Sequence, residues 1–310
     1  MIMTRMNDTP QRLHGAVRLH DWGVIRASGA EARKFLQGQL TQDMNAVAEG
    51  QARLAGFCSA KGRLQASFIV WQGAADEFLL ACSSDLLTST LKRLSMFVLR
   101  AKCRLSDASA ELPLWGVAGA AELNEMPLWS HRGMADAAII RLPDAAVAGQ
   151  PVARGLCAGT TPAALPELPA ETWRWLEAAS GVPRILAATI EQFVPQMINL
   201  ELVGGVDFQK GCYPGQEVVA RSQYRGTLKR RAFLLQADAP LQPGQEVFHS
   251  DDASQPAGMV VLAGSHAGRH NALVELKIAA THGPGSLHAG SADGPRLALG
   301  ELPYRIPAAE

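Results

Sequence analysis

The chain has 310 residues, of which 47% are hydrophobic, and its 29 basic and 29 acidic residues balance to a net charge of zero. This length favours two or three domains over a single core. A neutral chain has no overall attraction for nucleic acid or an anionic membrane, so direct nucleic-acid binding is not expected. The N-terminus lacks the apolar core of a secretory signal, and no apolar run approaches the roughly 18 residues of a membrane span. We therefore expect a cytoplasmic protein without membrane contact.

The five cysteines occur singly along the chain, without a Cys-x-x-Cys pair. This scatter is typical of a protein from a reducing compartment. An iron-sulfur cluster usually needs about four thiolates, commonly in close-spaced runs, and the late histidines lack the spacing of a zinc site. The sequence therefore predicts no resident metal. The cysteines are Cys58, Cys82, Cys103, Cys157 and Cys212.

The first third of the chain alternates strand and helix patterns. The strands expected at 54–58 and 64–71 are joined by Ser59–Gly62, a hairpin connection with a glycine where φ is positive. Leu87, Leu91, Leu94 and Val98 share one face of a helix that begins after Ser83. The pattern predicts an α+β unit with helices on a mostly antiparallel sheet. The other expected elements are strands at 17–19, 24–27 and 78–82 and a helix from about 30.

The remainder predicts a second α+β unit followed by a small β-barrel or sandwich. Residues 143–170 are rich in alanine, proline and glycine and favour an exposed connection with one short strand at 152–157. Gly181 and Pro183 end a helix that spans about 170–179. The last 80 residues carry short strands between glycine and proline turns. The other strands are expected at 114–117, 128–130, 138–142, 232–235, 259–262, 272–278 and 297–299. The expected domains are 1–110, 111–228 and 229–310.

The densest chemistry in the sequence lies at Lys210–Glu217. Gly211 and Gly215 permit positive φ or close approach, and Pro214 stiffens the run, so it favours a rigid loop. A thiol reacts as its thiolate, a form that the Lys210 ammonium could favour, which makes Cys212 the candidate reactive group. The alternative is that Cys212 is a small buried apolar residue.

The same run carries a family resemblance. Lys210, Gly211, Cys212, Tyr213, Gly215, Gln216 and Glu217 match the Lys-Gly-Cys-Tyr-x-Gly-Gln-Glu signature of the YgfZ family, and Arg221 follows at the family's usual spacing. That family is similar to the T-protein of the glycine cleavage system, a folate-dependent aminomethyltransferase. Agreement continues in order at 28–30, 35–43, 61–63 and 195–200. The resemblance is strongest between Pro195 and Arg221 and weakest between 110 and 170.

The resemblance implies an α+β, T-protein-like fold: two intertwined ferredoxin-like units around a central folate-binding channel, plus a C-terminal β-barrel. It implies tetrahydrofolate or a related folate as ligand, and iron-sulfur client enzymes, including those that thiolate tRNA, as partners. An accessory protein of iron-sulfur enzyme assembly or repair is therefore expected, with Cys212 as its reactive thiol. The alternative is a tetrahydrofolate-dependent aminomethyl or one-carbon transferase.

Two features bear on the ligand. The T-protein glutamate that contacts the pterin falls on Ala179, and Glu177, two residues earlier on the expected helix, should point elsewhere. A pterin pocket needs apolar walls with a few placed polar groups, and the glutamate tail of folate favours arginine. Without the resemblance, Gln39 is equally a solvated helix-end residue and Asp43 a turn or cap residue. The candidate folate contacts are Gln39, Thr41, Asp43, Arg63 and Asn199.

Overall fold

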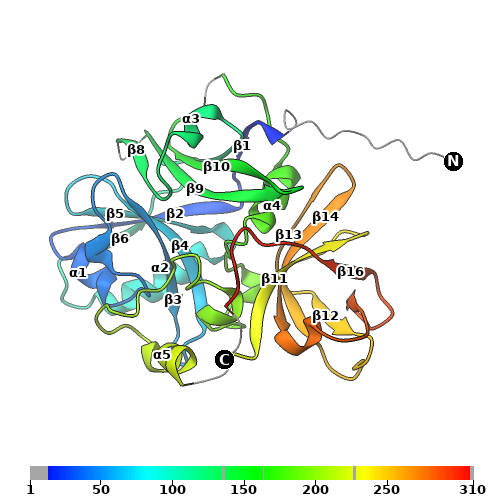
Figure 1. Ribbon diagram of the computed structural model, residues 1–310. Coiled ribbons are helices and arrows are strands. Elements are labelled where there is room, and N and C mark those ends of the chain that lie inside the picture. Colours follow the sequence, from blue (N-terminus) through cyan, green and yellow to red (C-terminus); the bar gives the residue numbers. More distant parts are fainter. Residues whose placement is uncertain (1–12, 135–136, 163, 226–227, 308–310) are drawn as a thin grey trace.

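The computed structural model describes residues 13–134, 137–162, 164–225 and 228–307. Two five-stranded sheets and a closed six-stranded barrel make up the molecule (Figure 1). This arrangement confirms the expected α+β class with a C-terminal barrel. Within the described ranges, no helix has the length and apolarity required to cross a membrane.

The first sheet has the strand order β3-β4-β5-β2-β6, and every pair of neighbours is antiparallel. Leu87 and Leu94 of helix α2 are buried in a cluster with apolar side chains of this sheet, which confirms the helix expected after Ser83. Helix α1 is shorter than the pattern suggested. The elements are α1 (Ala32–Gln37), α2 (Ser84–Val98), β2 (Trp22–Ser28), β3 (Ala52–Cys58), β4 (Leu64–Gln72), β5 (Glu77–Ser83) and β6 (Arg104–Asp107).

The second sheet has the order β1-β7-β10-β9-β8. Its first strand was expected in the first unit, but Val17 pairs with Gly116 of β7. In the described residues, the chain therefore contributes a strand to the second sheet before it forms the first sheet. A strand pairs wherever its apolar face is best covered, and that partner lies about 100 residues away, beyond the reach of a local pattern. The elements are β1 (Gly15–Arg18), β7 (Leu114–Ala118), β8 (His131–Met134), β9 (Ala137–Val147), β10 (Gln150–Ala158), α3 (Ala121–Asn124) and α4 (Ala170–Ala179).

Two local expectations for this sheet are wrong. The exposed connection expected from 143 is wrong up to Val147, because β9 continues to that residue. The short strand expected at 152–157 is confirmed as part of β10, which pairs on both sides, with β7 and β9. Alanine is a weak strand former, and the pairing compensates for it. Residues 128–130 form no strand, because Trp129 takes the left-handed φ of 60° and the chain turns there before β8.

The barrel closes in the order β11-β14-β13-β12-β15-β16. Helix α4 lies directly on it, since a Cβ at Gly264 of β13 would stand 2.1 Å from the backbone nitrogen of Trp175. The sequence pattern missed two short strands, β12 and β15. The elements are β11 (Arg230–Ala237), β12 (Glu246–His249), β13 (Gly258–His266), β14 (Arg269–Lys277), β15 (Leu287–Ala289), β16 (Arg296–Leu299), helix α5 (Gln216–Tyr224) and the 3-10 helices η2 (Met44–Ala46), η3 (Ala187–Thr189), η4 (Pro195–Ile198) and η5 (Ile278–Thr281).

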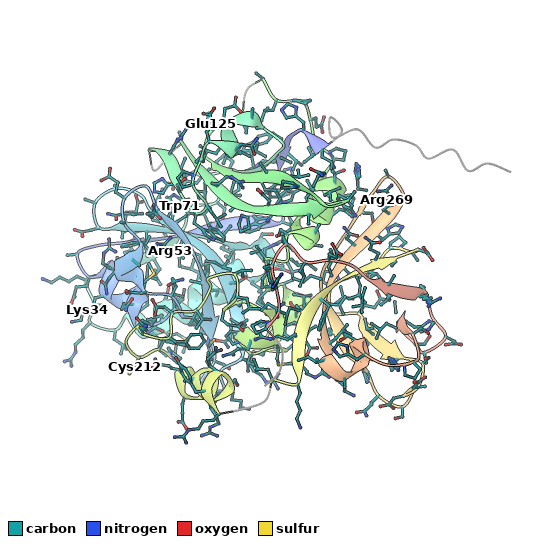
Figure 2. The ribbon with its side chains drawn as sticks, in the orientation of Figure 1. Lys34, Arg53, Trp71, Glu125, Cys212 and Arg269 are labelled. Carbon is teal, nitrogen blue, oxygen red and sulfur yellow. The ribbon has the colours of Figure 1, made fainter. Side chains whose placement is uncertain are left out.

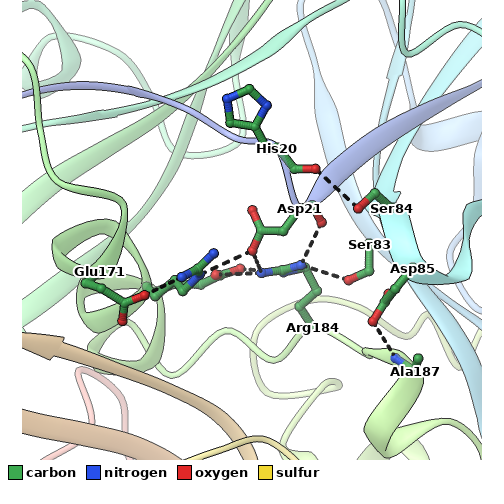
Figure 3. Close-up of polar contacts among 10 residues, drawn as sticks. His20, Asp21, Ser83, Ser84, Asp85, Glu171, Arg184 and Ala187 are labelled. Carbon is green, nitrogen blue, oxygen red and sulfur yellow. Dashed lines mark hydrogen bonds and ion pairs between the residues drawn. The ribbon is translucent and has the colours of Figure 1, made fainter. Parts of the chain in front are cut away.

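A buried ion-pair network joins both sheets to α4 (Figure 3). The Arg184 side chain donates to both carboxylate oxygens of Glu177, at 2.7 and 3.0 Å, to Asp21 at 3.2 Å and to the Ser83 hydroxyl at 2.8 Å. Arg184 and Glu177 are 4% and 5% exposed. Burial lowers the pKa of Arg184, but Glu177 and Asp21 outweigh that effect and raise it overall. Arg184 is therefore a cation at any working pH.

Replacing Arg184 with methionine should destabilise the protein by about 3–5 kcal/mol, because it leaves the Glu177 carboxylate buried without its partner. Denaturant unfolding of R184M measures this loss. The control is R174M, which removes a 40% exposed cation paired with Asp21 and Glu171 and should cost about 1 kcal/mol or less. Equal costs for the two variants would show that burial does not govern this network.

Candidate functional site

Cys212 is the exposed cysteine of this chain and lies on the loop beside α5 (Figure 2). Burial raises the pKa of the Cys58, Cys82 and Cys157 thiols to about 12, so these three are protonated at neutral pH. Burial also raises the pKa of the half-buried Cys103. Exposure therefore singles out Cys212 as the thiol that a reactant can reach. Its reaction stays a prediction.

Lys210 anchors this loop. Its Nζ donates to the carbonyl oxygens of Gln37 and Leu40, both at 2.5 Å, and stands 5.1 Å from the centre of the Tyr213 ring. The side chain is 8% exposed, and burial lowers its pKa to about 8, against the opposing effect of Asp43 and Asp207. The ammonium thus satisfies carbonyl groups at the C-terminal end of α1 and just beyond it. It fixes the thiol loop to the segment 37–43.

Gly215 brings the loop against the hairpin at 59–63. Its φ is +78°, and a Cβ there would lie 2.3 Å from the Ser59 carbonyl oxygen and 2.6 Å from the backbone nitrogen of Gly62. Two stretches that carried the resemblance are therefore in contact, although about 150 residues separate them. Gln216 and Glu217 open α5, where Glu217 pairs with Arg221 at 2.8 Å on the exposed face.

Four of the expected folate contacts are bonded to the protein itself. Thr41 is fully buried, and its hydroxyl donates to the Gly205 carbonyl at 2.5 Å. Asn199, also fully buried, donates to the Ala232 carbonyl at 2.8 Å. Asp43 accepts from the Asn45 backbone at 3.0 Å, and Arg63 donates to the Glu191 carbonyl at 3.3 Å. These side chains are spread over separate places, and their contact with folate stays a prediction.

Gln39, the fifth expected contact, differs from these four. Its Oε1 is buried and has no hydrogen-bond partner among the described residues. It does not line either of the two cavities described next.

A groove of about 580 Å³, here called the outer groove, opens next to the thiol loop. Asp207, Phe208 and Gln209 form one side and lead directly into Lys210, while Tyr224 comes from the end of α5, the helix that follows the loop. The Phe208 and Tyr224 rings meet edge to face at 5.9 Å. The lining residues are Gln42, Arg53, Leu54, Trp129, Gly204, Val206, Asp207, Phe208, Gln209 and Tyr224.

Sequence reasoning missed this groove. Its residues come from a strand, from turns before β8 and before the loop, and from a helix end, so no short motif contains them. One sequence feature could have indicated the groove: the aromatic residues Phe208 and Tyr224 lie on either side of the signature at Lys210–Glu217.

A second cavity, here called the central compartment, lies between the two sheets and α4. Its volume is about 30 Å³, and Leu54 and Trp129 line both it and the outer groove. Glu177 also lines it, whereas Ala179, two residues further along α4, does not. Arg184 holds both carboxylate oxygens of Glu177. Ala179 is fully buried in the core. The remaining lining residues are Trp22, Ser67, Phe68, Ile69, Leu142, Pro143, Arg154, Trp173, Val182, Pro183 and Arg184.

Trp129 stands at the boundary of the two cavities in a strained conformation. A φ of +60° is uncommon for a bulky side chain and requires support from its surroundings. That support comes from both sheets, since the Trp129 carbonyl accepts from Ala52 of β3 at 2.7 Å and its N–H donates to Arg141 of β9 at 3.0 Å. The wall between the cavities is therefore fixed by the same bonds that join the sheets.

Comparison with known proteins first defines the class. The structure matches the crystal structure of glycine cleavage system aminomethyltransferase T from Bartonella henselae with a TM-score of 0.73, over 94% of this chain and 86% of that one, at 16% identity. Two sheets, the helices on them and the closing barrel thus form the T-protein fold. No family model matches the chain.

Sequence relatives then give the family. The tRNA-modifying protein YgfZ of Edwardsiella ictaluri is 34% identical over 242 residues, 73% of this chain and 72% of the relative. Those of Photorhabdus laumondii and Colwellia psychrerythraea are 34% and 31% identical over 247 and 249 residues, and the alignments cover 72% and 74% of these relatives. The chain belongs to the YgfZ family, which confirms the resemblance read from Lys210–Glu217.

Replacing Gly215 with alanine should cost at least about 1–2 kcal/mol, because the new Cβ requires a strained φ and collides with the hairpin backbone. Thermal and denaturant unfolding measure the loss, and hydrogen exchange should quicken at 59–63. The matched control is G211A on the same loop, where no atom lies within 4 Å of the added Cβ, and its stability should change by about 0.5 kcal/mol or less. Similar costs for both variants would contradict the packing described.

Proposed function

We propose that this protein binds a folate in the outer groove and acts as an accessory factor in the assembly or repair of iron-sulfur enzymes, with Cys212 as its working thiol. One observation carries the proposal. The segment that forms one side of the groove, Asp207–Gln209, continues directly into the loop that bears the exposed cysteine. Ligand and thiol would therefore share one short stretch of chain.

The groove has the properties that a folate needs. Its volume of about 580 Å³ lies in the usual range of small-molecule sites, roughly 300–1,000 Å³. Trp129, Phe208 and Tyr224 offer aromatic faces to a flat ring. The Asp207 carboxylate suits the donor edge of a pterin, and the Arg53 guanidinium suits the carboxylates of the glutamate tail. The central compartment has a much smaller volume, about 30 Å³.

Bound folate would supply a one-carbon carrier, and the protein supplies the thiol and its position. Cys212 is exposed, so a client protein can reach it. The thiolate form is both the nucleophile and the iron ligand, and Lys210 holds the loop in place through two carbonyl groups. An exposed thiol in this position can accept a transferred group, contact a cluster in transit or be oxidised.

Aminomethyl transfer from glycine is less well supported. The position of the T-protein glutamate is the buried Ala179, and the nearby Glu177 carboxylate is neutralised by Arg184. A free carboxylate for the pterin is therefore absent from this part of the described site. A turnover assay with tetrahydrofolate and an aminomethyl donor tests the alternative, since sustained product formation would favour a transferase.

The name of the relatives, tRNA-modifying protein, suits an indirect effect on tRNA through iron-sulfur enzymes. The basic run at the start of the barrel offers little to RNA, because two of its cations are paired. Arg230 donates to both oxygens of Glu275 at 2.7 Å, and Arg231 pairs with Glu201. We therefore place the partner at the thiol loop and expect it to be a protein.

Replacing Phe208 with alanine should weaken tetrahydrofolate binding about tenfold or more, because one aromatic wall of the groove is lost. Isothermal titration calorimetry of the wild type and F208A measures the two affinities. L128A is the control, because Leu128 is 54% exposed, adjoins Trp129 in sequence and does not line the groove. A wild type that binds no folate would end the proposal.

Replacing Cys212 with alanine should abolish function in cells while folate affinity stays within about twofold of the wild type. The measurement is the activity of iron-sulfur enzymes in cells that carry only the variant. C103A, which removes a half-buried thiol outside the loop, should retain function. Full activity of the C212A cells would rule out a thiol role.

A further inference from the structure

The C-terminal end of α2 exposes an apolar surface. Met96, Phe97 and Leu99 are 67%, 43% and 88% exposed, and they are three of the seven large apolar side chains that are exposed among the described residues. A different face of α2, with Leu87 and Leu94, packs into the core of the first sheet. The three exposed side chains, here called the α2 patch, therefore lie outside that core and form a contiguous apolar surface of the kind that marks an interaction site.

Leu99 is held in a conformation that suits glycine. Its φ is +41°, in the left-handed region that a branched apolar side chain rarely adopts. The residue directly follows the last residue of α2, where a glycine often ends a helix. A leucine here destabilises the fold through its backbone and exposes its side chain to water, and it is not part of the core beneath α2. The packing of this chain does not offset either cost.

Cations surround the α2 patch. Residues 86–106 contain two lysines, three arginines and no acidic residue, although the whole chain is neutral. All five cations are exposed, and none forms an ion pair within the ranges that the structure describes. Such a surface attracts a partner of opposite charge and repels a cationic one. The five are Lys92, Arg93, Arg100, Lys102 and Arg104.

Helix α1 connects the α2 patch to the thiol loop. The chain after the patch is bonded to the residue before α1, since the Glu31 N–H donates to the Lys102 carbonyl at 3.1 Å and the Glu31 carboxylate accepts from the Lys102 N–H at 2.7 Å. The other end of α1 is bonded to Lys210 of the thiol loop. Between them α1, with the exposed Lys34 (Figure 2), has six residues and is roughly 9 Å long. A typical interface covers about 800 Å² of each protein, so one partner can cover the patch and the loop together.

We propose that the α2 patch docks a client protein through an apolar surface ringed by carboxylates, and so brings that client to Cys212. This inference rests on the proposed function, because the client is the iron-sulfur enzyme that the thiol serves. A membrane is a poorer occupant, since a helix that binds a bilayer lays its apolar face into it, and the apolar face of α2 is buried against the sheet. RNA would use the cations and leave Met96 and Leu99 without a contact.

Replacing Leu99 with glycine separates docking from folding. L99G should keep the melting temperature or raise it by about 2 °C, because it removes a strained φ, and it should leave the affinity for tetrahydrofolate unchanged. The activity of iron-sulfur enzymes in cells that carry only L99G should nevertheless fall at least about threefold. The control is L299A, which truncates a 49% exposed leucine of the barrel and should retain that activity.

Charge reversal tests the chemistry of the partner. R93E/R100E should lower the same activity about tenfold, whereas R132E/R296E, which makes an equal change in net charge at exposed arginines of β8 and β16, should leave it unchanged. A benzoylphenylalanine in place of Phe97 should cross-link an iron-sulfur enzyme in irradiated cells, and R93E/R100E should abolish that cross-link.

C212A distinguishes failure of the inference from failure of the proposed function. If cells with C212A lose activity and those with L99G and R93E/R100E keep it, the inference is wrong and the proposed function stands. Full activity with C212A would overturn the proposed function, and the inference with it. The inference would also be wrong if the purified protein bound phosphatidylglycerol vesicles or bulk tRNA, or formed dimers, in a way that L99G abolished.

Discussion

The arrangement of this molecule depends on balancing the buried charge of Arg184. A guanidinium buried between two sheets and a helix is tolerated only if its charge and its donors are satisfied. Glu177 comes from α4, Asp21 from the turn between β1 and β2, and Ser83 from the end of β5. One side chain thus fixes the relative positions of three segments that the sequence keeps far apart. The same network leaves the centre of the fold almost filled.

The cavity between the two sheets is small, about 30 Å³, and the larger volume of about 580 Å³ lies in the outer groove. The strained Trp129 divides the two spaces and is held by backbone bonds to both sheets.

Features set by neighbouring residues could be predicted from the sequence, whereas contacts between distant segments could not. The helix after Ser83, the hairpin at 59–63 and the loop that exposes Cys212 follow from apolar spacing, glycine positions and a dense motif. The placement of β1 in the second sheet and the pairing of β10 depend on partners far along the chain. Side chains such as Thr41 and Asn199 are polar in sequence and appear suited to a ligand, yet their bonds go to the protein's own backbone. The groove itself is assembled from five separate segments, so no short motif contains it.

The continuity of the groove and the thiol loop has a thermodynamic consequence. Asp207–Gln209 form one side of the outer groove, and three residues later the chain presents Cys212, with Lys210 held between them by its hydrogen bonds. If a ligand in the groove changes the conformation of this segment, the free energy of that change alters the affinity of a partner for the loop. Linkage makes that effect reciprocal, so a client protein would change the affinity for the ligand by the same factor. The segment would then couple binding at the groove to binding at the loop without the movement of a whole domain.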